Sequence, residues 1–191
     1  STNSTLDVSD VLLGSRAVPA LGAGATSVGS TSFPVPVGTA TGTYYLIAKA
    51  DADNAEAETQ EGNNTNARLI QVGPDLTIAL FTAPFSATAG ATISVSDTTR
   101  NQGGGAAGVS TTKFYLSSNS TLDGGDVLLG SRAVPTLAAG AQDTVTTALT
   151  IPAGTAPGTY YLIAQVDADS AVAETQEGNN TNARSIQISA P

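Results

Sequence analysis

The sequence contains no cysteine, histidine, tryptophan or methionine among its 191 residues. Without histidine or cysteine, the usual serine and cysteine triads, zinc fingers and haem or iron–sulfur ligation are excluded. The lack of cysteine also means that strand pairing and core packing hold the fold without disulfides. Carboxylates and hydroxyls remain, so a cation bound through oxygen atoms is the metal chemistry left open.

Basic residues are also scarce. Seven Lys and Arg stand against 16 Asp and Glu, which gives a formal net charge of −9. Such an acidic surface argues against binding to nucleic acid through a basic patch. No apolar run approaches the roughly 18 residues that a membrane span needs, so no direct membrane insertion is expected. The chain begins at Ser1 and shows no signal-peptide pattern, and we expect it to be a mature or excised piece of a longer protein.

An internal repeat dominates the sequence. Residues 1–73 align with residues 117–189 at a constant offset of 116 without a gap, and 50 of the 73 pairs are identical. Residues 74–116 have no counterpart upstream. We therefore interpret residues 74–191 as one complete repeat and residues 1–73 as the C-terminal part of a second copy. Repeats of this kind usually occur in longer arrays.

Short alternating segments separated by Gly, Pro and Asn indicate an all-β fold. Seven strands over about 115 residues are typical of an immunoglobulin-like β-sandwich. In the complete repeat the expected strands are 76–81, 92–100, 110–116, 127–133, 144–151, 158–166 and 183–188. In the partial copy we expect the last four strands, at 11–17, 26–35, 42–50 and 67–72.

Alternation within these strands assigns the side chains that face the core. In the complete repeat the inward positions include Ile93, Val95, Phe114, Leu116 and Leu162. Half a sandwich would expose such a face together with unpaired backbone groups. We therefore expect residues 1–73 to need covering strands, either from another chain or from residues outside this sequence.

Three pieces of the sequence resemble the CARDB family, the cell-adhesion-related domain of bacteria and archaea. They are Asn101 with the glycines that follow it, Phe114–Leu116 leading to Asp123–Leu129, and the loop from Asp167 to Asn180. The match runs through residues 74–188, and the second and third pieces recur in residues 1–73. The resemblance implies a seven-stranded sandwich that occurs in tandem on large secreted or surface proteins, and it implies no catalysis.

The loop before the last strand is the first candidate site. Four carboxylates and two amides within 14 residues offer oxygen ligands to a hard cation, and an irregular loop suits calcium better than magnesium. The alternative is a solvated turn whose Asp and Asn side chains cap backbone groups of the loop. The candidate calcium ligands are Asp51, Asp53, Glu58, Glu61 and Asn63 in the first copy and Asp167, Asp169, Glu174, Glu177 and Asn179 in the second.

Two further motifs give weaker hypotheses. A second cation candidate consists of Asn119, Asp123 and Asp126, where a turn between strands is the competing interpretation. Asn-x-Ser/Thr sequons make Asn3, Asn63, Asn119 and Asn179 the glycosylation candidates. Paired carboxylates also occur in glycosidases, but a chain with no Trp, five Tyr and four Phe lacks the aromatic platforms of a sugar cleft. We expect no enzyme.

The leading prediction is a structural module of a secreted or surface-attached protein, acting as a stalk or as the subunit of a self-assembling extracellular filament. Its partners are then other copies of the chain, through strand complementation or filament packing, and no cofactor is required. The short link at residues 72–74 predicts a nearly fixed relation between neighbouring repeats. The alternative is an adhesin that binds a protein or glycan through its loops and is stabilised by calcium.

Overall fold

A computed structural model describes residues 1–191, and the chain divides into two units, residues 1–70 and residues 71–191. Nearly all regular structure is β-strand, and the helical elements are two short 3-10 turns, η1 (Glu61–Asn63) and η2 (Glu177–Asn179). The chain contains no helix with the length and apolar character that crossing a bilayer requires. The predicted all-β sandwich class is confirmed.

Residues 71–191 contain eight strands. They are β3 (Leu76–Thr82), β4 (Ser86–Thr88), β5 (Thr92–Asn101), β6 (Ser110–Ser117), β7 (Val127–Val134), β8 (Gln142–Thr150), β9 (Gly158–Gln165) and β10 (Thr181–Ser189). One sheet has the order β4-β10-β9-β6-β7 and the other has the order β3-β5-β8. All seven predicted strands are present. The predicted count was one too low, because the three-residue β4 pairs in parallel with the end of β10 and is too short to show alternation.

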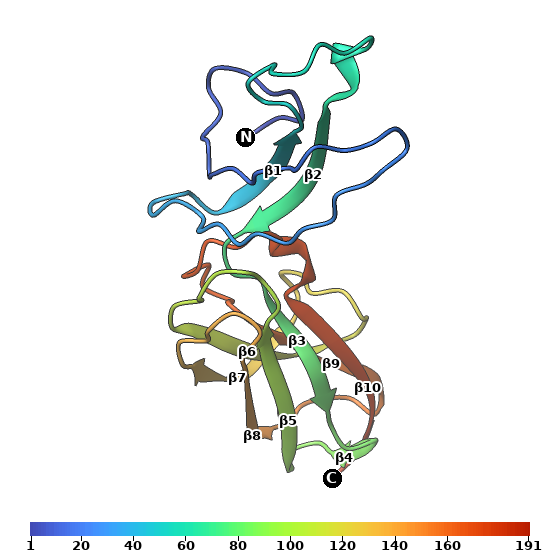
Figure 1. The fold of residues 1–191 in the computed structure, drawn as a ribbon. Coiled ribbons are helices and arrows are strands. Elements are labelled where there is room, and N and C mark those ends of the chain that lie inside the picture. The colour runs from blue at the N-terminus through green and yellow to red at the C-terminus, as the bar shows by residue number, and fades with distance from the viewer. The chain divides into compact units, whose positions relative to one another are not determined.

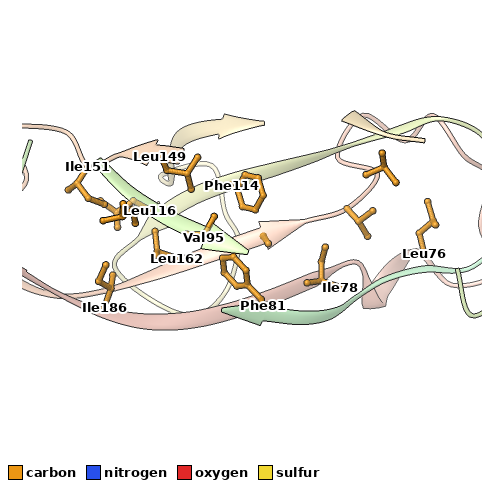
Figure 2. Packing of buried hydrophobic residues seen from close by; sticks show 14 of the residues in the cluster. Leu76, Ile78, Phe81, Val95, Phe114, Leu116, Leu149, Ile151, Leu162 and Ile186 are labelled. Carbon is orange, nitrogen blue, oxygen red and sulfur yellow. The ribbon is translucent and has the colours of Figure 1, made fainter. Parts of the chain in front are cut away.

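The core of this unit is made by side chains from both sheets (Figure 2). Phe81 of β3 and Phe114 of β6 stack with their ring centroids 6.1 Å apart. All five predicted inward residues are buried, namely Ile93, Val95, Phe114, Leu116 and Leu162. Alternate side chains of a strand point to opposite faces, so the apolar positions of each strand meet in the core.

A buried ion cluster that was not predicted from the sequence links the two sheets. Arg132 of β7 donates from Nε and Nη2 to the two carboxylate oxygens of Asp97 on β5, at 2.8 and 2.5 Å, and from Nη1 to Asp143 of β8 at 2.7 Å. Burial disfavours the charged guanidinium, but the two carboxylates outweigh it and raise the pKa of Arg132. The sequence did indicate that Asp97 faces the core, because it is the next alternate residue after the inward Ile93 and Val95.

The first copy forms a single hairpin of β1 (Gly42–Lys49) and β2 (Thr65–Val72), the strands labelled in the N-terminal part of Figure 1. The repeat offset matches these strands to β9 and β10. The two hairpins also close in the same way, because Ala50 N–H donates to Asn64 O at 2.8 Å and Val166 N–H donates to Asn180 O at 2.9 Å.

Two predicted strands of the first copy, 11–17 and 26–35, are wrong, because these residues belong to no ladder. Their counterparts β7 and β8 are strands because they pair with β6 and β5 respectively. The sequences of β5 and of β6 up to residue 116 have no equivalent within residues 1–73. A strand exists through its ladder, so the same residues without a partner do not form one.

The absent ladders leave apolar side chains of the first copy in solvent. Val18 is 52% exposed, whereas its counterpart Val134 is 1% exposed. Leu46 of β1 is 45% exposed, whereas Leu162 of β9 is 1% exposed. The first copy thus has the inward residues of a sandwich without the strands that cover them.

Candidate functional site

The chain passes from β2 to β3 through Gly73, Pro74 and Asp75, which are all buried. The carbonyl oxygen of each residue accepts one backbone hydrogen bond. Gly105 N–H donates to Gly73 at 2.9 Å, Thr175 N–H to Pro74 at 3.0 Å and Gln102 N–H to Asp75 at 2.8 Å. All of these partners lie within residues 71–191. We call these three residues the link, and the link is part of the fold of the second unit before β3 begins.

Asn101, at the end of β5, is the centre of the structure around the link. It is fully buried, and its Oδ1 accepts the N–H groups of Asp75 and Gly103, each at 3.1 Å. Its Nδ2 donates to the carbonyls of Gly105 at 2.7 Å and Leu137 at 3.0 Å. Only an amide combines these donors and acceptors, so a carboxylate or an apolar side chain would leave buried backbone groups unpaired.

Two glycines after this asparagine allow the link to pass close to the loop. A Cβ on Gly103 would lie 2.5 Å from the Gly73 oxygen and 2.6 Å from the Asp75 nitrogen. A Cβ on Gly105 would lie 2.9 Å from the Gly73 Cα, whereas one on Gly104 would meet nothing closer than 3.7 Å. Gly103 and Gly105 therefore have to be glycine, because any side chain at these positions would collide with the backbone of the link.

The acidic loop of the second copy also reaches the link. Asp75 is 3% exposed, and its carboxylate accepts hydrogen bonds from Asn179 Nδ2 at 2.9 Å and Gln102 Nε2 at 3.0 Å. Asp75 was not among the predicted site residues, because it belongs to none of the candidate site motifs. Its position could have indicated a structural role, because Asp75 is one of only three residues between the strands predicted at 67–72 and 76–81.

Two of the five predicted calcium ligands of this loop, Asp167 and Glu177, bind the loop's own backbone. Asp167 is buried, and its carboxylate accepts the N–H groups of Ala171 and Val172, each at 3.0 Å. Glu177 accepts the N–H of Glu174 at 3.1 Å. These are the capping interactions of the turn that was the alternative interpretation.

The first copy repeats these contacts. Asp51 accepts the N–H of Ala55 at 2.9 Å, and Glu61 accepts the N–H of Glu58 at 3.0 Å. Asp169 forms an ion pair with Lys113, a residue without a counterpart in the first copy, which leaves Asp53 without this partner. The chain gathers no group of three or more acidic side chains placed to hold a metal ion. The calcium site stays a prediction.

Glu174 departs from this pattern. Both of its carboxylate oxygens are buried without a hydrogen-bond partner, and so are the Oδ1 atoms of Asn179 and Asn180. Burial raises the pKa of Glu174 to about 7, and the nearby Asn180 amide and Leu76 N–H oppose this rise only in part. A proton, a water molecule or a hard cation would each satisfy the buried carboxylate of Glu174. The calcium hypothesis therefore keeps its best support at Glu174.

The side chains of the weaker cation candidate bind backbone groups of their own segment, and this cation site stays a prediction. Asn119 Oδ1 accepts the N–H of Thr121 at 2.8 Å, Asp123 Oδ1 accepts that of Gly125 at 2.8 Å, and Asp126 Oδ2 accepts that of Asp123 at 2.9 Å. The first copy repeats the three bonds at 2.7, 2.8 and 2.9 Å. These side chains hold the backbone, as the competing interpretation anticipated.

The four sequons differ in accessibility. Asn3, Asn63 and Asn119 are exposed. Asn179 is half-buried, and its Nδ2, the atom that a glycan would modify, donates to Asp75. A glycan is therefore compatible with the three exposed asparagines, whereas one on Asn179 would break the contact that holds the link.

Comparison with known proteins connects these features to a family. The CARDB family profile matches residues 1–68 and residues 73–184, which together make up most of the chain. The chain belongs to the CARDB family. The resemblance seen in the sequence is confirmed, and both copies carry it. No curated protein matches the chain.

Several solved structures are similar to this CARDB chain. The crystal structure of the CARDB domain of PF1109 from Pyrococcus furiosus, in complex with di-metal ions, is 21% identical, with 61% of this chain and 90% of that chain covered and a TM-score of 0.48. A domain of a protein predicted to lie on the cell surface of Methanosarcina acetivorans is 21% identical. The match covers 62% of this chain and 94% of that domain, with a TM-score of 0.45. A β-glucosidase from Listeria innocua is 16% identical, with a TM-score of 0.42.

CARDB domains are non-catalytic structural domains. The similarity to the β-glucosidase covers 62% of this chain but 16% of the enzyme, and it is not evidence of activity. What the repeat can do must therefore be sought in the groups that it holds in place, of which the link is the best defined.

Proposed function

We propose that this CARDB chain is a spacer in a tandem array of extracellular or cell-surface domains, in which one repeat joins the next with little freedom of rotation. The observation that carries the proposal is the buried link of Gly73, Pro74 and Asp75. A linker acts as a hinge where its residues are free in solvent, as in Gly/Ser-rich linkers. Each residue of this link is instead bonded to the unit that follows it.

The number of bonds supports a link that stays closed. Three backbone bonds hold the link carbonyls, one more joins the Asp75 N–H to Asn101, and two hold the Asp75 carboxylate, which makes six. Each bond contributes about 1 kcal/mol net, and leaving the buried partners unsatisfied costs more. Opening of the link is therefore expected to be rare, as a stalk or a filament subunit requires.

The adhesin alternative has weaker support. Its loops would have to offer free polar groups to a partner, but two acidic side chains of each loop bind loop backbone: Asp51 and Glu61 in the first copy, and Asp167 and Glu177 in the second. The acidic charge of the chain, −9, suits a soluble array of domains that repel non-specific contacts. We therefore favour the spacer.

Residual dipolar couplings of the full chain test the spacer. Amides of β1 and β2 and amides of β3–β10 are expected to share one alignment tensor. Gly103→Ala places a Cβ against the link backbone, so it is expected to separate the two tensors and to destabilise residues 71–191 by about 1–3 kcal/mol, the usual cost of overpacking. Gly104→Ala is the matched control and should leave the single tensor intact. Two independent tensors in the unsubstituted chain would refute the proposal.

A further inference from the structure

The turn between β6 and β7 contains Asp123 followed by Gly124, and this is the one place in the chain where a glycine directly follows an aspartate or an asparagine. An aspartyl side chain can react with the backbone nitrogen of the next residue. Glycine leaves the approach to that nitrogen open because it has no Cβ. Both residues are exposed to solvent. The pair is therefore a candidate for spontaneous modification of the main chain.

Hydrogen bonds of this turn fold the side chain of Asp123 back over the backbone. Its Oδ1 accepts the N–H of Gly125 at 2.8 Å, so the carboxyl group bridges across the residue between them, which is Gly124. Asp123 N–H donates to Asp126 Oδ2 at 2.9 Å, and Asp126 N–H donates to Asp123 O at 3.3 Å. These bonds keep the carboxyl group of Asp123 on the side of the turn where the nitrogen of Gly124 lies.

The backbone nitrogen of Gly124 is free to react. Its N–H donates to no group of the chain, whereas the N–H groups of Asp123, Gly125 and Asp126 are all engaged. A Cβ at Gly124 would meet nothing within 4 Å, so the surrounding space is open. Reaction requires the nitrogen and the carboxyl carbon to approach within about 3–3.5 Å in line with their orbitals. Gly124 can make this movement without losing a hydrogen bond or meeting another residue.

The first copy contains the same turn with valine in place of this glycine. Asp7 Oδ1 accepts the N–H of Ser9 at 2.8 Å, Asp7 N–H donates to Asp10 Oδ2 at 2.9 Å, and Asp10 N–H donates to Asp7 O at 3.2 Å. Val8, which is fully exposed, occupies the position of Gly124. The turn therefore forms without glycine at this position, and the branched side chain of valine hinders approach to its nitrogen. The two copies differ in reactivity and share a structure here.

We propose that Asp123 is a site of spontaneous isomerisation to isoaspartate. The nitrogen of Gly124 attacks Cγ of Asp123 and forms a C–N bond, which closes a succinimide ring. The hydroxyl of the carboxylic acid and the hydrogen of the Gly124 N–H leave together as water. Another water molecule then opens the ring. Cleavage at Cγ restores aspartate, whereas cleavage at the main-chain carbonyl leaves the chain connected through Cγ as isoaspartate. The proposal is independent of the spacer function.

Isomerisation would change the connection between two strands of the complete copy. It adds one carbon atom to the main chain and moves the carbonyl of Asp123, which accepts the N–H of Asp126. The ladder of β6 and β7 begins directly after the turn, with Leu116 opposite Val127. We expect this end of the ladder to open more often in the modified molecules. The equivalent turn of the first copy should keep its original backbone.

Incubation of the full chain at physiological temperature and neutral pH, followed by tryptic digestion, tests the proposal. Cleavage after Lys and Arg releases the two turns in separate peptides, residues 1–16 and 114–132. Isoaspartate leaves the mass unchanged but alters chromatographic retention, and an isoaspartate methyltransferase with a labelled methyl donor identifies it. Isoaspartate is expected to form at Asp123 about tenfold or more faster than at Asp7, because valine restricts the approach of the reacting atoms. Equal rates at the two positions would overturn the proposal.

Two reciprocal substitutions exchange the residue that distinguishes the turns. Gly124→Val reproduces the turn of the first copy and is expected to slow the reaction at Asp123 by about tenfold or more, while NMR signals of β6 and β7 verify that the fold is retained. Val8→Gly reproduces the turn of the second copy and should raise the rate at Asp7 to that of Asp123. An undiminished rate in Gly124→Val, or an unchanged rate at Asp7 in Val8→Gly, would contradict the assignment of the reaction to this turn and its glycine.

Discussion

Residues 11–18 and residues 127–134 have the same sequence, VLLGSRAV, and different structures. The second of them is β7, paired with β6, whereas the first belongs to no ladder. The hairpin of β1 and β2 nevertheless forms in the first copy as β9 and β10 do in the second. The two hairpin strands are each other's partners, but the partners of β7 and β8 come from residues 92–117.

The comparison separates strand propensity from strand formation. Val, Leu and Ile at alternating positions fit a pleated, half-buried surface, but the stabilisation comes from cross-strand neighbours and burial. Where the neighbours are present, Val134 and Leu162 are almost fully buried, and where they are absent Val18 and Leu46 are about half exposed. One sequence therefore has two environments, and equivalent substitutions should have unequal effects.

The largest expected effect comes from a charge at an inward position. Leu162→Asp would bury an unpaired carboxylate in the core and is expected to destabilise residues 71–191 by about 4 kcal/mol or more, enough to unfold a marginal domain. Leu46→Asp, the equivalent change in the first copy, should cost about 0.5 kcal/mol or less because the side chain is already in solvent. Chemical denaturation followed by NMR signals of each unit measures both. Equal losses would show that the first copy is not open.

The buried ion cluster gives the next effect. Asp97→Ala leaves Arg132 buried without its bidentate partner and should cost about 3–5 kcal/mol in the same measurement. Arg16→Ala, at the equivalent position of the first copy, should change stability by less than about 0.5 kcal/mol. The double change of Asp97→Leu and Arg132→Met should recover most of the loss, because an apolar pair removes the uncompensated charge. A double variant no more stable than Asp97→Ala would contradict this account.

These contrasts show what the sequence could predict. Alternation located β3, β5, β6, β7, β8, β9 and β10 and their inward residues because each has its partners in the same copy. The strands predicted at 11–17 and 26–35 failed for the same physical reason, since pattern identity carries no information about whether a partner is present. The three-residue β4 lies below the length at which alternation can be recognised.

The site was less predictable. The acidic residues of the loop were predicted to be oxygen ligands of a cation, but Asp167 and Glu177 bind the backbone of their own loop. Composition alone does not distinguish backbone capping from metal coordination. Asn101 and its glycines were noticed as a family pattern, yet their function required the path of the link across them. Asp75 carried no signal beyond its place between two strands.

The pH dependence of stability gives a smaller contrast, at Glu174. Its pKa in the folded unit is about 7, above the ordinary value of 4.5, so the folded state holds a proton that the unfolded state has lost. The contribution of Glu174 to the free energy of unfolding is therefore fully present below pH 4.5. It is lost as the pH rises through 7, where the folded state also gives up the proton. Glu174→Gln should flatten that part of the profile of unfolding free energy against pH. A profile equally steep in the variant would assign the effect to another group.

Calcium should produce the smallest effect, confined to one copy. Asn64 donates to the carboxylate of Glu58 at 2.6 Å in the first copy, whereas the carboxylate oxygens of Glu174 have no hydrogen-bond partner. Millimolar calcium at pH 8 is therefore expected to raise the unfolding temperature of residues 71–191 by about 3 °C, because an ion that binds the native state alone stabilises it by mass action. The rise should be absent in Glu174→Gln and smaller with magnesium, which demands a rigid octahedral site. No rise in the unsubstituted chain, and no fall with chelator, would end the calcium hypothesis and leave Glu174 as a proton-binding group.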